Sequence, residues 1–211
     1  MKLTWYGQSA FKVVLGGKTV YLDPHRLAGE LEPADLILVS HGHWDHCDPD
    51  SIKLISEEDT PILAPKAAAE KLSGNVQEVS EKEVVDLDDL TIEVVPAYNT
   101  TRPNHPKGSG VGYIIRAEGE SVYHAGDTDL IPEMQSLLQI TVALLPVGGT
   151  YTMDADEAVC AAEAINPKIA IPMHYGEVVG TREDAEEFKT KVEAETQTKV
   201  VILEKGGELE L

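Results

Sequence analysis

Three histidines and an aspartate lie within six residues of one another, in the segment 40–48, which reads Ser-His-Gly-His-Trp-Asp-His-Cys-Asp. Imidazole nitrogen suits Zn²⁺, iron or manganese, and a carboxylate adds a hard oxygen ligand. Gly42 allows the backbone to turn so that neighbouring imidazoles can converge. The alternative is a histidine-rich surface loop, but seven histidines in the whole chain would seldom cluster in this way by chance. The segment therefore predicts a metal site nucleated by His41, His43, Asp45 and His46.

Three further candidates come at or just after the ends of other expected strands. His124 and Asp127 close one strand, and His174 follows another. Ligands from different strand ends can meet at one rim of a sheet, where α/β proteins usually place their active sites. Taken alone, Asp127 could be a turn residue between Gly126 and Thr128. His174 alone could be a core or capping histidine. Asp127 and His174 are therefore expected to be metal ligands only because the first cluster is present.

Alternating or continuous apolar runs predict the strands. The run at 36–39 is continuous, which indicates a strand buried on both faces. Gly16 and Gly17 predict a hairpin turn. The loop 98–112 is rich in Pro, Gly, Asn and Thr, and loops of this length are often functional. The expected strands are 3–6, 10–15, 19–22, 36–39, 62–64, 77–79, 83–87, 91–95, 112–116, 121–124, 142–147, 169–172, 200–203 and a short last one after the turn 205–207.

Helices are expected mainly in the second half of the chain. Asp50 is a candidate N-cap for a helix over 51–56, and Thr181 with Asp184 resembles a capping box. The remaining expected helices are 66–72, 132–138, 154–165 and a charged one from 181 to about 196. Strands come in two batches, each followed by helices, and no linker separates the halves. We expect one α/β domain over 1–211, a four-layer αββα sandwich of two mixed sheets with helices on the outer faces.

Composition limits the functional classes. With 42% hydrophobic residues the chain can bury a sizeable core. No apolar run is long enough for a membrane helix, and the N-terminus lacks the pattern of a signal peptide. The two cysteines form no CxxC pair, which fits a reducing compartment, so a cytoplasmic location is expected. The formal net charge of −20 disfavours nucleic acid as a partner.

The motif His-x-His-x-Asp-His at 41–46, followed by Gly126-Asp127 and then His174, resembles the metallo-β-lactamase superfamily over essentially the whole chain. Leu22-Asp23-Pro24 and the run Leu-Pro-Val-Gly-Gly at 145–149 also fit in order. The small members with little lid structure, which include ascorbate-6-phosphate lactonase, are the most similar. The first motif is highly specific, whereas the later pieces are convincing through their order and spacing.

The resemblance implies a role for each matching residue. His41 and His43 would bind one divalent metal, Asp45, His46 and His174 would bind a second, and Asp127 would bridge the two. A hydroxide held between the metals would be the nucleophile, because a metal lowers the pKa of bound water toward neutrality. Asp45 could orient that hydroxide or shuttle a proton. The expected cofactor is two zinc ions, with manganese or iron as alternatives.

One position departs from the family pattern. The family commonly places a third histidine for the first metal after the middle strands, and Asn99 stands there. An amide oxygen ligates more weakly than imidazole. His105 could replace it as a ligand or contact the substrate, or be an ordinary loop residue. A single tightly bound metal is the other option.

Other residues have smaller roles open to them. His124 could support the site, donate a proton or only pack in a strand. Arg102 and Lys107 bring positive charge to the loop, which suggests an anionic substrate, although solvated loop charges are the alternative. His25 could approach the site, Trp44 could shield it, and Cys47 is expected to pack in the core.

We expect a metal-dependent hydrolase that opens a phosphodiester, lactone or ester bond of a small, anionic metabolite. A nuclease of the same fold and a metal-binding protein without catalytic activity are the alternatives. A redox site with two irons is a further option, but the chain has no room for the electron-transfer domain it would need. No membrane partner is expected, and the sequence leaves open whether the chain forms a homo-oligomer.

Overall fold

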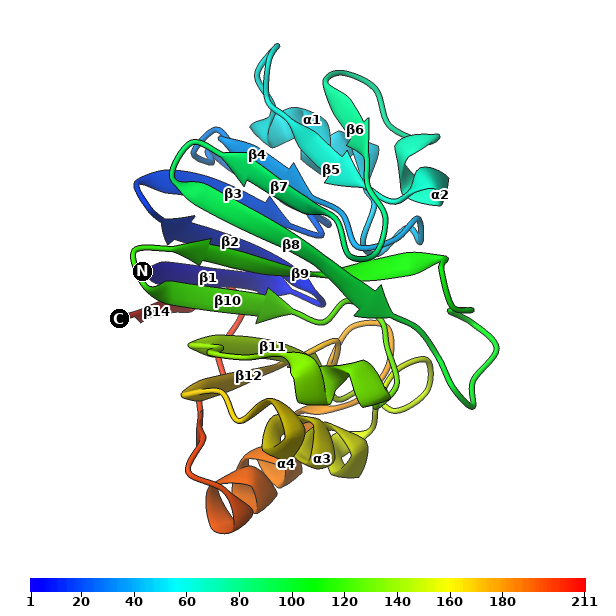
Figure 1. Ribbon diagram of the computed structural model, residues 1–211, viewed down its shortest axis with the longest axis vertical. Helices are drawn as coiled ribbons and strands as arrows, with labels where there is room; N and C mark the ends of the chain where they lie inside the picture. Colours follow the sequence, from blue (N-terminus) through cyan, green and yellow to red (C-terminus); the bar gives the residue numbers. More distant parts are fainter.

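The computed structural model describes residues 1–211 as two seven-stranded sheets packed face to face (Figure 1). The first sheet has the order β14-β1-β2-β3-β4-β5-β6. Its strands are β1 (Lys2–Gly7), β2 (Ala10–Leu15), β3 (Lys18–Leu22), β4 (Leu36–Leu38), β5 (Ile62–Ala64), β6 (Val76–Glu78) and β14 (Glu208–Glu210). Neighbours from β14 to β3 are antiparallel, and those from β3 to β6 are parallel.

The second sheet has the same mixed character, with the order β13-β12-β11-β10-β9-β8-β7. Its neighbours are antiparallel from β7 to β10 and parallel from β10 to β13. Its strands are β7 (Val84–Leu87), β8 (Leu90–Ala97), β9 (Gly110–Ala117), β10 (Glu120–His124), β11 (Val142–Pro146), β12 (Ile169–Met173) and β13 (Lys199–Val200).

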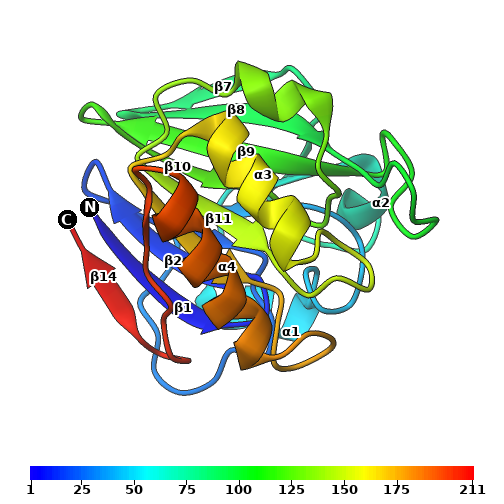
Figure 2. The ribbon, with the colours of Figure 1, turned by 90° about the horizontal axis from the view of Figure 1, so that it is seen from below.

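Helices lie on the outer face of each sheet. The pair that covers the second sheet is in the foreground of Figure 2. The helices α1 (Pro49–Ile55) and α2 (Lys66–Ala69) pack on the first sheet through a buried cluster of 10 residues. The helices α3 (Ala155–Ile165) and α4 (Arg182–Glu195) pack on the second sheet and belong to a core of 47 buried residues that also fills the space between the sheets. The expected αββα sandwich is confirmed. No helix combines the length and the apolar character needed to cross a bilayer.

The strand β4 shows why its sequence is continuously apolar. Leu36 and Leu38 face the large core between the sheets, whereas Ile37 faces the cluster under α1 and α2. A strand that is buried on both faces cannot carry polar residues at alternate positions. The hairpin between β2 and β3 also follows the prediction, because Gly16 and Gly17 both have positive φ, 59° and 70°, as a two-residue turn of this kind requires.

Several element boundaries differ from the predictions. The helix α1 begins at Pro49, and Asp48 caps it by accepting a hydrogen bond from the backbone of Asp50, because proline at the first position favours an earlier start. The expected helix over 132–138 is a short 3-10 turn, η1 (Pro132–Ser136). Helix 66–72 ends at Ala69, and strand 200–203 is replaced by the two-residue β13. The capping box of Thr181 and Asp184 is confirmed.

The strand ends that precede the chemically interesting residues gather at one rim of the sandwich. His41 follows β4, Asp127 follows β10 and His174 follows β12 directly, while β8 leads into the loop that carries His105. The fold thereby brings together side chains that are up to 133 positions apart in sequence, from 41 to 174.

Candidate metal centre

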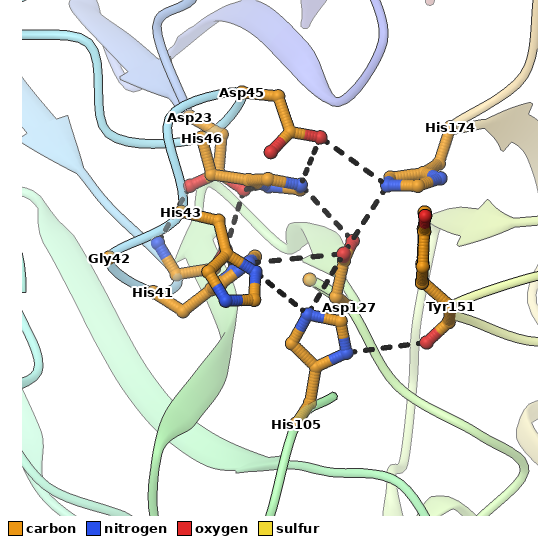
Figure 3. A network of polar contacts seen from close by, with 12 residues as sticks. Asp23, His41, Gly42, His43, Asp45, His46, His105, Asp127, Tyr151 and His174 are labelled. Carbon is orange, nitrogen blue, oxygen red and sulfur yellow. Dashed lines mark hydrogen bonds and ion pairs between the residues drawn. The ribbon is translucent and has the colours of Figure 1, made fainter. Parts of the chain in front are cut away.

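Seven side chains form two adjoining groups at this rim (Figure 3). In each group the possible ligand atoms all lie within 4.8 Å of one another. All seven are buried except His43, which faces solvent. The first group consists of His41, His43, His105 and Asp127, and the second of Asp45, His46 and His174.

The carboxylate of Asp127 contacts histidines of both groups. One oxygen, Oδ2, lies 3.3 Å from Nε2 of His105 and 3.2 Å from Nε2 of His174. The other, Oδ1, lies 3.2 Å from Nε2 of His46. Asp127 therefore stands where a ligand shared by two metal ions would stand.

Hydrogen bonds hold three of the histidines with Nε2 turned toward the centre. The Nδ1–H of His46 donates to Asp23 at 2.7 Å. His41 donates from Nδ1 to the hydroxyl of Ser40 at 3.0 Å, and that hydroxyl in turn donates to Asp23 at 2.6 Å. His105 uses Nδ1 to bond the carbonyl of Tyr151 at 3.2 Å. Each Nε2 is thus directed at the centre, where its lone pair is available to a metal once any proton on it has been displaced.

The free nitrogen atoms crowd together. Nδ1 of His43 lies 3.0 Å from Nε2 of His41 and 3.1 Å from Nε2 of His105. Nε2 of His46, from the second group, and Oδ1 of Asp127, from the first, are fully buried and make no hydrogen bond, although they lie 3.2 Å apart. Unpartnered buried polar atoms are costly, and a cation among these lone pairs would satisfy them. The donor set therefore fits a divalent metal.

The electrostatics of the centre also favour positive charge there. Burial opposes the charged form of Asp127, but the neighbouring His174 and His46 hold its pKa well below the usual value. Burial likewise opposes ionisation of Asp45, yet its hydrogen bond and attraction to His46 lower its pKa. Burial lowers the pKa of His105, and burial together with His46 lowers that of His41. Burial lowers the pKa of His46 too, but the carboxylates of Asp127 and Asp23 outweigh it and raise that pKa well above its usual value. In the metal-free centre two carboxylates therefore stay ionised beside a positively charged His46, while His41 and His105 stay neutral.

Two residues that orient the ligands were missed as functional residues by the sequence interpretation. Asp23 holds both His46 and, through Ser40, His41. It was noted only as part of the family pattern. Gln8 is fully buried, and its side-chain amide donates to Oδ2 of Asp45 at 2.9 Å. No local sequence signal distinguishes Gln8.

Glycines allow the backbones to approach at the rim. A Cβ on Gly148 would lie 2.3 Å from the carbonyl oxygen of His174, so only glycine fits beside that ligand. Gly126 has φ of 63°, and a Cβ there would lie 2.9 Å from the carbonyl oxygen of Val111. His174 itself has φ of 58°, and its backbone N–H donates to the carbonyl of Gln8 at 2.9 Å.

Asn99 does not take the position of a ligand. Its oxygen accepts hydrogen bonds from the backbone N–H and the ring Nδ1–H of His105, at 2.9 and 3.1 Å. Its amide nitrogen donates to Asp129 at 2.8 Å and to the carbonyl of Tyr151 at 3.0 Å. His105 fills the place of the third histidine, and Asn99 orients it from behind.

The positive charges expected to attract an anionic substrate are already paired. Arg102 bonds Asp129 at 2.6 Å and Glu157 at 2.7 Å. Lys107 bonds Glu133 at 2.8 Å and lies 4.4 Å from the ring centre of Tyr98. Both side chains fasten the loop that carries His105, so the expectation of an anionic substrate loses its support.

His124 bonds backbone groups and belongs to neither ligand group, which agrees with the supporting role expected for it rather than with a direct catalytic one. Its Nε2–H donates to the carbonyl of Ser9 at 2.9 Å, and its Nδ1 accepts from the backbone of Gly126 at 3.2 Å. Both nitrogens are therefore occupied by backbone groups, and the ring supports the turn that leads to Asp127.

The remaining candidates lie around the edge of the centre. His25 is buried, has no hydrogen-bond partner on either nitrogen, and contacts the ring of Trp44 at a centroid distance of 5.3 Å. Cys47 packs in the cluster under α1 and α2, and burial raises the pKa of its thiol to about 11. A cavity of about 350 Å³ opens above the two groups, and its walls are formed by Trp44, Asn104, Tyr151 and Val178.

Comparison with known proteins agrees with this geometry. Residues 2–174 match the model of the β-lactamase superfamily domain. A metal-dependent hydrolase of Methanopyrus kandleri is 37% identical to this chain, with 100% of both chains covered. The match to the family model and to this relative shows that the chain belongs to the metallo-β-lactamase superfamily, as one of its metal-dependent hydrolases.

Two solved structures share the fold as well as the sequence similarity. A crystal structure from Parabacteroides distasonis is 33% identical, with a TM-score of 0.86, and the match covers 95% of this chain and 91% of that one. A metallo hydrolase of Ignicoccus hospitalis is 30% identical, with a TM-score of 0.82 over 100% and 98% of the two chains.

The contact between Asn99 and His105 predicts the effect of an Asn99→Ala variant. Without the amide, the ring of His105 loses one of its two oriented hydrogen bonds, and we expect metal affinity to fall by about 10-fold to 100-fold, as for other residues that orient ligands. Titration of metal-free protein against a chromophoric chelator measures this. Asn104→Ala, in the same loop but without a side-chain hydrogen bond, is the control; equal affinity in both variants would contradict the assignment.

The burial of His124 predicts a pH dependence of stability in metal-free protein. Burial lowers the pKa of His124. The unfolded chain therefore binds this proton more readily, and stability is lost as the pH falls below about 6.5, the value for unfolded histidine. Denaturant unfolding at pH 7.5 and 5.5 should show a smaller loss for His124→Gln than for the natural chain, by up to about 1 kcal/mol. If the loss of stability between pH 7.5 and 5.5 is the same in the variant and the natural chain, burial does not lower the pKa of His124 and the prediction is wrong.

Proposed function

We propose that this protein hydrolyses an ester, lactone or phosphodiester bond of a small molecule with the help of two divalent cations. The observation that carries the proposal is the position of Asp127, whose carboxylate contacts histidines of both groups. The first group offers three histidine nitrogens and one carboxylate oxygen, that of Asp127. The second offers two histidine nitrogens and an oxygen of Asp45, and Asp127 also contacts both of its histidines.

The donor set supports zinc as the cation, with manganese or iron as alternatives. Five of the seven side chains are histidines. Imidazole binds zinc, iron and copper well, whereas magnesium and calcium prefer oxygen ligands. Divalent cations at such a site supply a Lewis acid and lower the pKa of bound water.

The protein's own residues would manage the proton and the orientation of the water. Asp45 lines the cavity, and its pKa is lowered by His46, so it stays a carboxylate that can accept a hydrogen bond from water. Gln8 holds one of its oxygens at 2.9 Å and thereby fixes the direction of the other. We infer that Asp45 aligns the attacking water and accepts its proton.

The size of the cavity supports a small substrate. About 350 Å³ is near the lower end of the range for small-molecule sites. No lysine or arginine lines it, which disfavours a nucleic-acid strand as substrate.

An Asp127→Asn variant tests the proposal. We expect about two metal equivalents per natural chain, measured by elemental mass spectrometry on protein purified without chelator, and a lower content in the variant. In the variant, the rate of hydrolysis of a panel of chromogenic esters, lactones and phosphodiesters should fall by at least about a thousandfold, because the metals no longer stabilise the transition state by several kcal/mol.

Asp88→Asn is the matched control. This carboxylate is exposed and pairs only with Lys18, at 3.1 Å, so metal content and activity should stay unchanged. A metal-free natural chain that takes up no zinc, manganese or iron would refute the proposal. Full metal content with no hydrolysis of any substrate would instead favour a binding protein.

A further inference from the structure

The walls of the cavity above the metal centre differ in character from its floor. The floor consists of ligand side chains, among them Asp45, Asp127 and His174. The walls include Trp44 and Tyr151, two of only six large apolar side chains that are exposed on the whole protein, at 58% and 37%. Large exposed aromatic groups are costly in water, and their concentration in one cavity indicates a binding surface.

The two aromatic walls belong to different parts of the centre. Trp44 lies between His43 and Asp45 in sequence, so it adjoins both ligand groups. Tyr151 is tied to the first group, because its carbonyl accepts the Nδ1–H of His105 at 3.2 Å. A molecule that reaches the metal centre therefore passes beside both rings. Val178, half-buried, extends the apolar lining.

The ring of Trp44 is supported from behind. The ring of His25 packs against it edge-to-face, at a centroid distance of 5.3 Å and an interplanar angle of 71°. The guanidinium of Arg26 lies 5.6 Å from the ring centre. These contacts hold the indole as a preformed wall, which lowers the entropic cost of binding against it.

No unpaired cation is present to bind a charged substrate tail. None of the residues that line the cavity is a lysine or an arginine. The nearby cations have other partners: Arg26 stacks on Trp44 and pairs with Glu177 at 3.7 Å, and Lys71 donates to the carbonyl of Gly42. Arg102 and Lys107 are paired as described above. An additional phosphate or carboxylate on the substrate would be desolvated here without a counter-charge.

We propose that the substrate is an uncharged carboxylic ester or lactone that carries an aromatic or branched apolar group, which lies against Trp44 and Tyr151. This inference rests on the proposed hydrolytic function and defines its substrate class. Water adds to the carbonyl carbon, the bond from that carbon to the alkoxy oxygen breaks, and the leaving oxygen takes up a proton that water has given up. An ester then gives a carboxylic acid and an alcohol, and a lactone gives a single hydroxy acid. The free amide of Asn104, the remaining polar wall, is available to hydrogen-bond the substrate.

Binding of two small amides tests the inference without requiring catalysis. The probes are N-benzylacetamide, which is neutral and aromatic, and N-acetylglycine, which is anionic. Ligand-observed NMR titrations of metal-loaded protein measure the Kd of each probe. The Kd of the neutral probe should be at least about tenfold lower than that of the anionic one, because one well-packed aromatic contact changes affinity by about this factor. Trp44→Ala should remove most of that preference. Leu138→Ala, which truncates another exposed apolar side chain away from the cavity, should leave it unchanged.

Hydrolysis separates this inference from the proposed function. We compare 4-nitrophenyl butyrate with 4-nitrophenyl hemisuccinate, which has a similar size but an added carboxylate. A higher kcat/KM for butyrate, which falls about tenfold in Trp44→Ala while the metal content is unchanged, supports the inference. Preference for the hemisuccinate, or tighter binding of N-acetylglycine, overturns the inference and leaves the hydrolase. If the natural protein hydrolyses neither ester but still binds N-benzylacetamide more tightly than N-acetylglycine, the proposed hydrolytic function is overturned instead.

Discussion

The structure depends on one buried carboxylate that two groups of histidines share. Asp127 is almost fully buried, and burying an ionised carboxylate costs several kcal/mol unless positive charge compensates it. Its two oxygens contact His46 on one side and His105 and His174 on the other. A divalent cation in each group, as proposed above, would supply that compensation and stabilise the centre together with the local fold. The strands β4, β10 and β12 end at this rim, and this brings the ligands that follow them together.

A second layer of side chains determines which atom each ligand presents. Asp23 fixes His46 directly and His41 through Ser40, while Gln8 fixes Asp45. Asn99 and Asp129 perform the same task for the loop that carries His105, and Arg102 fastens that loop to α3 through Glu157. Such partners are what give a site of this kind its affinity and geometry.

Much of the fold and most of the ligand set could be predicted from the sequence, because both depend on local patterns. The continuous apolar run of β4 indicated burial on both faces, and the motif at 41–46 indicated the metal site. What could not be predicted depends on contacts between distant residues. Whether Asn99 or His105 ligates is decided by where the loop closes, and the roles of Arg102 and His124 are decided by partners far away in sequence. The predicted start of the first helix was wrong because proline favours the first position of a helix, so α1 begins at Pro49 with Asp48, not Asp50, as its N-cap.

The central claim is that Asp127 joins two metal positions. Anomalous diffraction from crystals of the zinc-loaded protein, recorded on both sides of the zinc absorption edge, tests it most directly. The account predicts two peaks about 3.5–4 Å apart, the spacing of two-metal sites, one in each ligand group with Asp127 between them. A single peak within one group, or two peaks of which neither is ligated by Asp127, would contradict it.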